Sequence, residues 1–198
     1  MATRTSHLLL VLGSFLTGLV LFLAVFLYAT GQFGGATSGA TIGGPFRLTD
    51  QNGKPITDAD LKGKPFLVFF GYTHCPDVCP TTLFNVSEVM RALGPDADRT
   101  RALFITVDPD RDTPAVLKDY LANFDPHLIG ATADQKNLDV VEKEYRVFTQ
   151  KVPTGKDGDY SMDHSALVYL MDKQGRFVAP FKLDKSPQDA AKELRKYM

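Results

Sequence analysis

Residues 65–80 read PFLVFFGYTHCPDVCP and decide the fold class of this chain. The first eight, Pro65–Tyr72, form an apolar run without a charge, which is typical of a strand buried on both faces of a sheet. Leu103–Val107 and Ala166–Met171 show the same pattern further along the chain. Because such strands need helices on both faces of their sheet, the pattern predicts an α/β domain.

Segments with helical spacing of apolar residues alternate with these strands. Pro80 suits the first position of one helix, which Gly94 ends. Thr113–Pro114 and Ser186–Pro187 each read as a cap followed by a first turn, and the last helix is predicted to run to Met198. The apolar stripes are Leu83, Val86, Val89, Met90 and Leu93; Val116, Leu117, Tyr120, Leu121 and Phe124; and Leu138, Val141 and Tyr145.

Two hairpins complete the predicted sheet. Asn52-Gly53 favours a type I′ turn between strands at residues 46–49 and 54–57. Residues 172–175, Asp-Lys-Gln-Gly, separate the strand that ends at Met171 from one at Phe177–Phe181. A further short strand is expected near His127–Ala131. The order of elements predicts a mixed sheet flanked by helices.

The N-terminal part differs from the rest, because Arg4 is the only Asp, Glu, Lys or Arg before Arg47. Residues 8–29 are free of charge and would rise about 33 Å as a helix, enough to span a bilayer. Leu27-Tyr28-Ala29 is not a small-x-small cleavage site, which favours an uncleaved anchor over a signal peptide. The bias of positive charge places residues 1–7 in the cytoplasm. A glycine-rich tether at 30–44 leads to one domain at 45–198 outside.

The overall charge argues against one class of partner. The 198 residues include 22 Lys and Arg against 23 Asp and Glu, which gives a net charge of -1. Without a basic excess to neutralise phosphates, nucleic acid is not expected to bind.

The two cysteines lie together as Cys75-x3-Cys79, between a buried strand and a helix. This position is at the carboxyl end of the strand, and ligand sites of α/β sheets form at the carboxyl ends of their strands. A structural disulfide would close a loop of only five residues and would stabilise the fold little. A helix N-terminus is expected to favour both thiolates. Two chemistries stay open, thiol–disulfide exchange and binding of a soft metal.

A third ligand would favour the metal, and four histidines are candidates. His7 belongs to the N-terminal tail, His127 lies in an apolar stretch, and His74 neighbours Cys75 but is free to point the opposite way. His164 directly precedes the buried strand Ala166–Met171, which would hold it in place.

Three motifs in order resemble the Sco/SenC family, the membrane-anchored proteins needed for cytochrome c oxidase synthesis. They are GYTHCPDVCP at 71–80, VDPDRDTP at 107–114 and Asp163-His164-Ser165. The likeness covers residues 45–198. It implies a thioredoxin-like fold with an added N-terminal hairpin, and this fold would place Asp163–Ser165 beside the cysteines.

The resemblance implies that Cys75, Cys79 and His164 bind one copper ion per chain. Two thiolates and an imidazole suit Cu(I) and can also hold Cu(II). Zinc is not excluded, although a structural zinc site closes with four ligands. Two roles stay open for Asp163, orienting His164 or facing solvent, and two for Asp77, approaching the ion or capping the helix.

The leading hypothesis is a copper chaperone that is not an enzyme and helps to assemble the dinuclear copper centre of cytochrome c oxidase. The alternative is a thiol–disulfide reductase, with Cys75 and Cys79 as its redox pair, that keeps the oxidase cysteines reduced. Expected partners are the copper-site subunit of the oxidase, a periplasmic copper donor and a periplasmic thiol reductase. The expected location is the bacterial inner membrane, crossed once, with the C-terminal domain in the periplasm. The loop Asp108–Pro114 either caps its own helix or forms a docking rim.

Overall fold

The computed structural model describes residues 13–26, 42–155 and 158–198, which belong to two units, Met1–Ala40 and Thr41–Met198. Residues 13–26 form a helix within the predicted span 8–29. The rest of that span, the tail 1–7 and the tether up to residue 41 lie outside the described residues. In the part of the chain that is described, no helix has both the length and the apolarity needed to cross a membrane.

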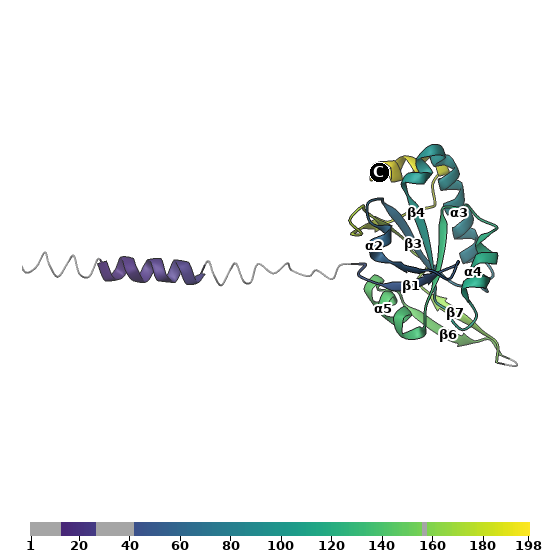
Figure 1. The fold of residues 1–198 in the computed structure, drawn as a ribbon, viewed down its shortest axis with the longest axis horizontal. Helices are drawn as coiled ribbons and strands as arrows, with labels where there is room; N and C mark the ends of the chain where they lie inside the picture. Colours follow the sequence, from purple (N-terminus) through teal and green to yellow (C-terminus); the bar gives the residue numbers. More distant parts are fainter. Residues whose placement is uncertain (1–12, 27–41, 156–157) are drawn as a thin grey trace, which may run out of the picture. The chain divides into compact units, whose positions relative to one another are not determined.

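A mixed sheet forms the centre of the second unit (Figure 1). Its strands follow the order β2-β1-β5-β4-β3-β8-β9. Neighbours among β3, β4 and β5 run parallel, and the other pairs are antiparallel. The strands are β1 (Arg47–Asp50), β2 (Pro55–Thr57), β3 (Phe66–Gly71), β4 (Arg101–Thr106), β5 (Leu128–Thr132), β8 (Val168–Met171) and β9 (Phe177–Pro180).

Helices cover both faces of this sheet. In Figure 1, α2 and α5 lie on one side of the strands and α3 and α4 on the other, with α6 packed against α3. The helices are α2 (Asp58–Leu61), α3 (Val78–Leu93), α4 (Pro114–Leu121), α5 (Gln135–Tyr145) and α6 (Pro187–Arg195), and a 3-10 helix spans Gly94–Arg99. This arrangement confirms the predicted α/β class.

The central strand β3 explains why the sequence pattern was informative. All six of its residues are buried, and successive side chains point to opposite faces. The Phe70 ring packs against Tyr145 of α5, whereas the Phe69 ring stacks on Phe104 of β4 on the α4 side. Every buried hydrophobic side chain among the described residues lies between Phe46 and Leu194, so the second unit carries its own core.

The first hairpin forms as predicted, but its turn is not type I′. That type needs positive φ at both central residues, and only Gly53 has one (φ 76°). Gly53 N–H instead donates to the Asp50 carbonyl (3.0 Å), and the Asp50 side chain accepts from the backbone N–H of Asn52 and Lys54, both at 2.8 Å. The turn is therefore closed by hydrogen bonds to the Asp50 carboxylate, and it does not need a second residue with positive φ.

Helix α3 starts earlier than the sequence predicts. Its first residue is Val78, so Cys79 lies in the first turn and Pro80 is the third residue instead of the first. Proline is tolerated there, because the N–H groups of the first turn have no partner within the helix. The shift buries Cys79, which has no exposed surface.

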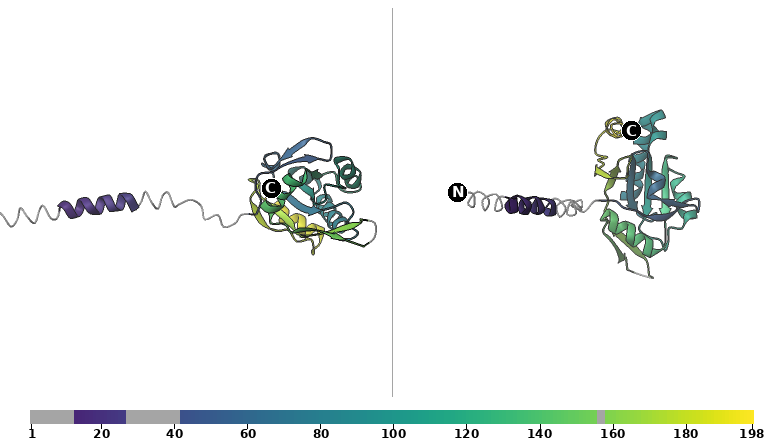
Figure 2. Two further views of the ribbon diagram at one scale, coloured as in Figure 1. Left: turned by 90° about the horizontal axis from the view of Figure 1, so that it is seen from below. Right: turned by 60° about the vertical axis from the view of Figure 1, so that its left-hand side comes forward.

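A second small sheet was not predicted. Strands β6 (Thr149–Pro153) and β7 (Tyr160–His164) pair antiparallel, outside the main sheet. Their residues are half-buried or exposed without the alternation that marks a strand in a sequence. Figure 2 shows this hairpin at the end of the domain where α5 also lies.

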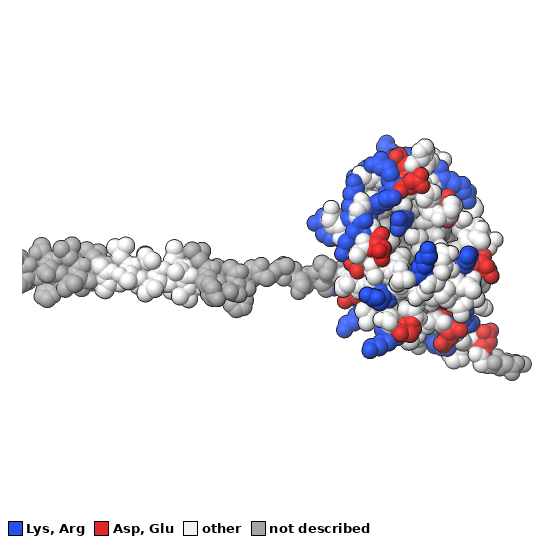
Figure 3. All heavy atoms as spheres, in the orientation of Figure 1, with Lys and Arg blue, Asp and Glu red and all other residues white. Residues whose placement is uncertain are grey.

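Basic and acidic side chains, which are nearly equal in number in the sequence, are also mixed on the surface of the domain. Figure 3 shows Lys and Arg interspersed with Asp and Glu on the face in view. Several form ion pairs, such as Lys62–Asp58 at 2.7 Å and Arg195–Asp96 at 2.9 Å.

Candidate metal centre

The two cysteines lie just beyond the carboxyl end of β3. The chain leaves the strand at Gly71 and turns through a short loop that contains Cys75 before it enters α3. Cys75 is half-buried, and its Sγ accepts a hydrogen bond from the backbone N–H of Cys79 at 3.3 Å. An N–H group of the first helical turn, which has no partner within the helix, thus points at the Cys75 sulfur.

His164 comes from a different element than the sequence suggests. It is the last residue of β7 in the small sheet, and three residues separate it from β8 of the main sheet. Its imidazole packs edge-on against Phe69 and Tyr72, at centroid distances of 6.2 and 5.9 Å. The imidazole of His164 therefore has an aromatic ring on two sides.

The structure brings the three predicted residues together. The Sγ atoms of Cys75 and Cys79 and an imidazole nitrogen of His164 all lie within 4.8 Å of one another. The Cys79 Sγ to His164 Nε2 distance is 3.5 Å, although 85 residues separate them in the sequence. Both cysteines are free thiols. Two sulfurs and one imidazole nitrogen are soft donors, so this group suits one copper ion.

The two thiols differ in environment, which corrects the expectation that the helix favours both thiolates. Burial raises the pKa of Cys79 well above its usual value, and its contact with Cys75 adds to the effect. The desolvation of a fully buried sulfur outweighs the helix N-terminus here. The Cys79 proton must leave when a metal binds, so binding is coupled to proton release.

A backbone carbonyl, not Asp163, orients His164. The Nδ1 atom of His164 lies 3.1 Å from the Ser165 carbonyl oxygen, which leaves Nε2 toward Cys79. Asp163 is exposed, so the second of its two predicted roles applies. Burial lowers the pKa of His164, which favours the neutral imidazole that a metal needs.

Asp77 neither joins the candidate ligand group nor caps α3 in the usual way. It is the N-cap residue of α3, but its side chain makes no capping hydrogen bond with the helix backbone. It accepts a long hydrogen bond of 3.5 Å from the Thr81 hydroxyl. The neighbouring His74 is exposed and lies outside the group of three, 3.1 Å from the Thr73 hydroxyl.

The loop Asp108–Pro114 follows β4 and lies at the same edge of the sheet as the cysteines. Its predicted local role is confirmed, because the Thr113 side chain accepts from Val116 N–H and Arg111 forms an ion pair with Asp108. Sequence reasoning missed its contacts with the rest of the site. The burial of the two carboxylates, Asp108 and Asp112, is a signal that only the structure provides.

The sequence of this chain was compared with those of known protein families and proteins. The model of the SCO1/SenC family matches residues 34–198. A SCO2-like protein of Rickettsia felis is 42% identical over 156 residues, which are 78% of this chain and 76% of that one.

Solved structures agree with the sequence match. The copper-bound ScoI of Bradyrhizobium japonicum is 63% identical, with a TM-score of 0.78 over 79% of this chain and 99% of that one. The copper-bound Sco1 of yeast is 36% identical, with a TM-score of 0.72 over 79% of this chain and 88% of that one. The fold is therefore the thioredoxin-like fold that the Sco proteins share, and the chain belongs to the SCO1/SenC family.

Proposed function

We propose that this protein is a membrane-anchored copper chaperone that helps to build the dinuclear copper centre of cytochrome c oxidase. Relatives in this family have been solved with copper bound, and the Sco proteins form a family of cytochrome c oxidase assembly proteins. The single observation that carries the proposal is the group Cys75, Cys79 and His164, whose donor atoms converge within 4.8 Å from two distant segments.

The geometry suggests how the copper is handed over. Cys79 has no exposed surface, whereas Cys75 and His164 are half-buried. An incoming thiolate or imidazole of the acceptor would approach from the side of these two residues. Ligand exchange would then release the ion stepwise, with Cys79 as the last ligand to leave.

The anchor and the location are part of the proposal. Residues 8–29 carry no charge, residues 13–26 are helical, and Arg4 precedes them. This pattern supports one span of a bacterial inner membrane with the domain in the periplasm. The partners would be the copper-site subunit of the oxidase, a copper donor, and a thiol reductase that keeps the cysteines able to bind.

Anaerobic titration with Cu(I) tests the proposal. The reduced unit of residues 41–198 would be titrated under a competing chelator beside His164→Ala and Cys75→Ser. Tight one-to-one binding that both substitutions weaken supports the chaperone with these ligands. Weak binding by the unchanged protein, or binding that is indifferent to His164, contradicts it.

A second candidate function rests on the closeness of the two sulfurs. Cys75 as thiolate would attack a target disulfide and release one target thiolate. Cys79 would then attack the Cys75 sulfur and lose its proton to the departing target thiolate, which leaves a Cys75–Cys79 disulfide, a fully reduced target and two electrons transferred. A thiol reductase would restore the pair. Loss of target reduction in Cys75→Ser, with full activity in His164→Ala, would favour this function.

A further inference from the structure

The hairpin that carries His164 needs an explanation for its position. Strands β6 and β7 pair with each other and not with the main sheet, and His164 pairs with Thr149 at the open end of the hairpin. A two-stranded hairpin by itself is marginally stable in water. Other contacts must therefore hold it against the domain, and these contacts also set where His164 lies relative to the cysteines.

Arg111, in the loop after β4, contacts this hairpin through several groups. Its Nη1 donates to the Tyr160 carbonyl at 3.0 Å, and its guanidinium lies 3.8 Å from the centroid of the Tyr160 ring. Its Nε donates to Asp108, whose other oxygen accepts from the Tyr160 hydroxyl at 2.7 Å. Asp108 is 2% exposed, so these bonds are shielded from water.

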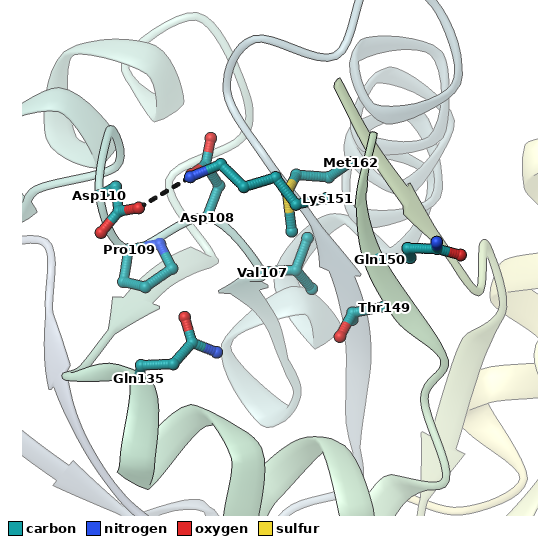
Figure 4. Close-up of a pocket in the computed structure, with 9 residues that line it drawn as sticks. All are labelled: Val107, Asp108, Pro109, Asp110, Gln135, Thr149, Gln150, Lys151 and Met162. Atoms are coloured by element: carbon teal, nitrogen blue, oxygen red, sulfur yellow. Dashed lines mark hydrogen bonds and ion pairs between the residues drawn. The ribbon is translucent and has the colours of Figure 1, made fainter. Parts of the chain in front are cut away.

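A second contact joins the same loop to the other strand of the hairpin. Lys151 of β6 forms an ion pair with Asp110 at 3.1 Å (Figure 4). Its ammonium also lies 3.7 Å from the Tyr160 ring centroid. Half of the Lys151 side chain is exposed, so this pair contributes less than the buried contacts of Arg111.

The neighbouring residue of the loop holds the cysteine segment. Asp112 has no exposed surface and accepts from the Thr73 N–H at 2.9 Å and the Thr73 hydroxyl at 2.6 Å. It also accepts from the Thr106 hydroxyl of β4 at 2.6 Å. Thr73 lies two residues before Cys75. Adjacent residues of one loop thus hold the two segments that supply the candidate ligands.

Arg111 also reaches His164 by a shorter route. Its guanidinium carbon lies 5.8 Å from the centroid of the Tyr72 ring, and that ring packs edge-on against the His164 imidazole. Arg111 therefore lies between two aromatic rings, Tyr160 on the hairpin and Tyr72 beside the cysteine loop. A cation between two ring faces is attracted to both.

We infer that Arg111 is a positioning residue for copper binding, one that fixes His164 at the correct distance from Cys75 and Cys79. The inference rests on the proposed function, because it assigns Arg111 a role only in a site that binds copper. Residues that orient metal ligands typically change metal affinity by about 10- to 100-fold. Arg111 does this through the placement of β7 and makes no contact with the ion.

A double-mutant cycle tests this role. Cu(I) affinity of the reduced unit 41–198 would be measured for the wild type, Arg111→Met, His164→Ala and the double variant. Arg111→Met is expected to weaken binding about tenfold or more in the wild-type background and to cause no further loss once His164 is absent. In the apo state, the backbone amides of β6 and β7 should exchange hydrogen faster in Arg111→Met than in the wild type.

Further variants separate positioning from general damage. Arg111→Lys keeps the charge and should recover part of the affinity, and Tyr160→Phe, which removes only the hydroxyl bond to Asp108, should lose less than Arg111→Met. Arg176→Met is the matched control, because it breaks an arginine–aspartate pair in the β8–β9 turn, with Asp172 at 2.8 Å. The control should leave copper affinity and the exchange of β6 and β7 unchanged.

Several outcomes would overturn the inference. Wild-type affinity in folded Arg111→Met would do so, and so would an equal loss in the presence and absence of His164. If Arg111→Met does not fold, the cycle is run with Arg111→Lys, and wild-type affinity in that variant would contradict the role. Failure of the wild type itself to bind copper would contradict the proposed function instead.

Discussion

Gly71 is the position where a single methyl group should disturb copper binding most directly. It ends β3, and a Cβ there would lie 2.8 Å from the Cys79 sulfur, 2.8 Å from a ring carbon of Phe104 and 3.2 Å from a ring carbon of Phe69. All three side chains are buried, with exposures of 0%, 1% and 2%. The φ angle of Gly71 is not positive, so alanine fits the backbone and the strain comes from these close contacts.

The size of the effect follows from these distances. Non-bonded carbon atoms pack best at about 3.5–4.0 Å, so the new methyl would be about 1 Å too close to Cys79 and Phe104 and less crowded against Phe69. Overpacking of this kind costs about 1–3 kcal/mol of stability. A metal ligand, however, must stay within about 0.2 Å of its bonding distance. If the Cys79 sulfur takes up a large part of the shift, copper affinity should fall at least about tenfold, or about 1.4 kcal/mol.

Gly130→Ala supplies the matched control. A Cβ on Gly130 of β5 would lie 2.6 Å from a terminal methyl carbon of Leu121 in α4, so the steric change is similar. It should lower stability in urea unfolding of the apo protein but leave Cu(I) affinity unchanged in competition titrations. Wild-type copper affinity in folded Gly71→Ala would refute the reasoning, because it would show that packing does not fix the Cys79 sulfur.

Three further predictions concern the stability of the fold and not copper affinity. Asp112→Ala should cost about 3 kcal/mol or more in urea unfolding, since each buried donor left without an acceptor costs about 1–3 kcal/mol; a loss below 1 kcal/mol would contradict this. Burial acts to lower the pKa of His127, but its bonds to Asp125 and Asp98 outweigh this and raise the pKa above its usual value. Stability from this group is therefore complete below about pH 6.5 and lost as the pH rises through the folded pKa, so urea midpoints should fall over that range and His127→Gln should remove the fall. Burial raises the pKa of Glu142, which destabilises the folded state once the pH exceeds the usual value for glutamate, so Glu142→Gln should raise the thermal midpoint at neutral pH and not at about pH 4.

Much of the main sheet could be predicted because its strands carry strong local signals. The apolar run at 65–72 became β3, and the stripe that stops at Gly94 became α3, whose C-cap is Gly94 with φ 58°. The predicted type of the turn around Gly53 was wrong, because the side chain of Asp50 accepts the hydrogen bonds that close the turn. Sequence patterns report periodicity and special residues, and they do not report which polar side chain reaches which backbone group.

The small sheet shows where local signals end. Strands β6 and β7 lack an alternating apolar pattern, and polar contacts with the loop after β4 help to hold them against the domain. Arg111 and Asp108 are close in sequence, so their ion pair was predictable. Their contacts with Tyr160 join positions 49 and 52 residues away and could be seen only in the fold.

The sequence by itself determined the chemistry of this protein, and the tertiary structure decided its geometry. Two cysteines and a histidine in motifs that resemble one family were enough to predict soft-metal binding, because ligand type follows from residue identity. The burial of Cys79, the carbonyl that orients His164 and the loop that joins their segments depend on contacts between distant parts of the chain. Such contacts form only when the core packs, and for that reason only the folded chain reveals them.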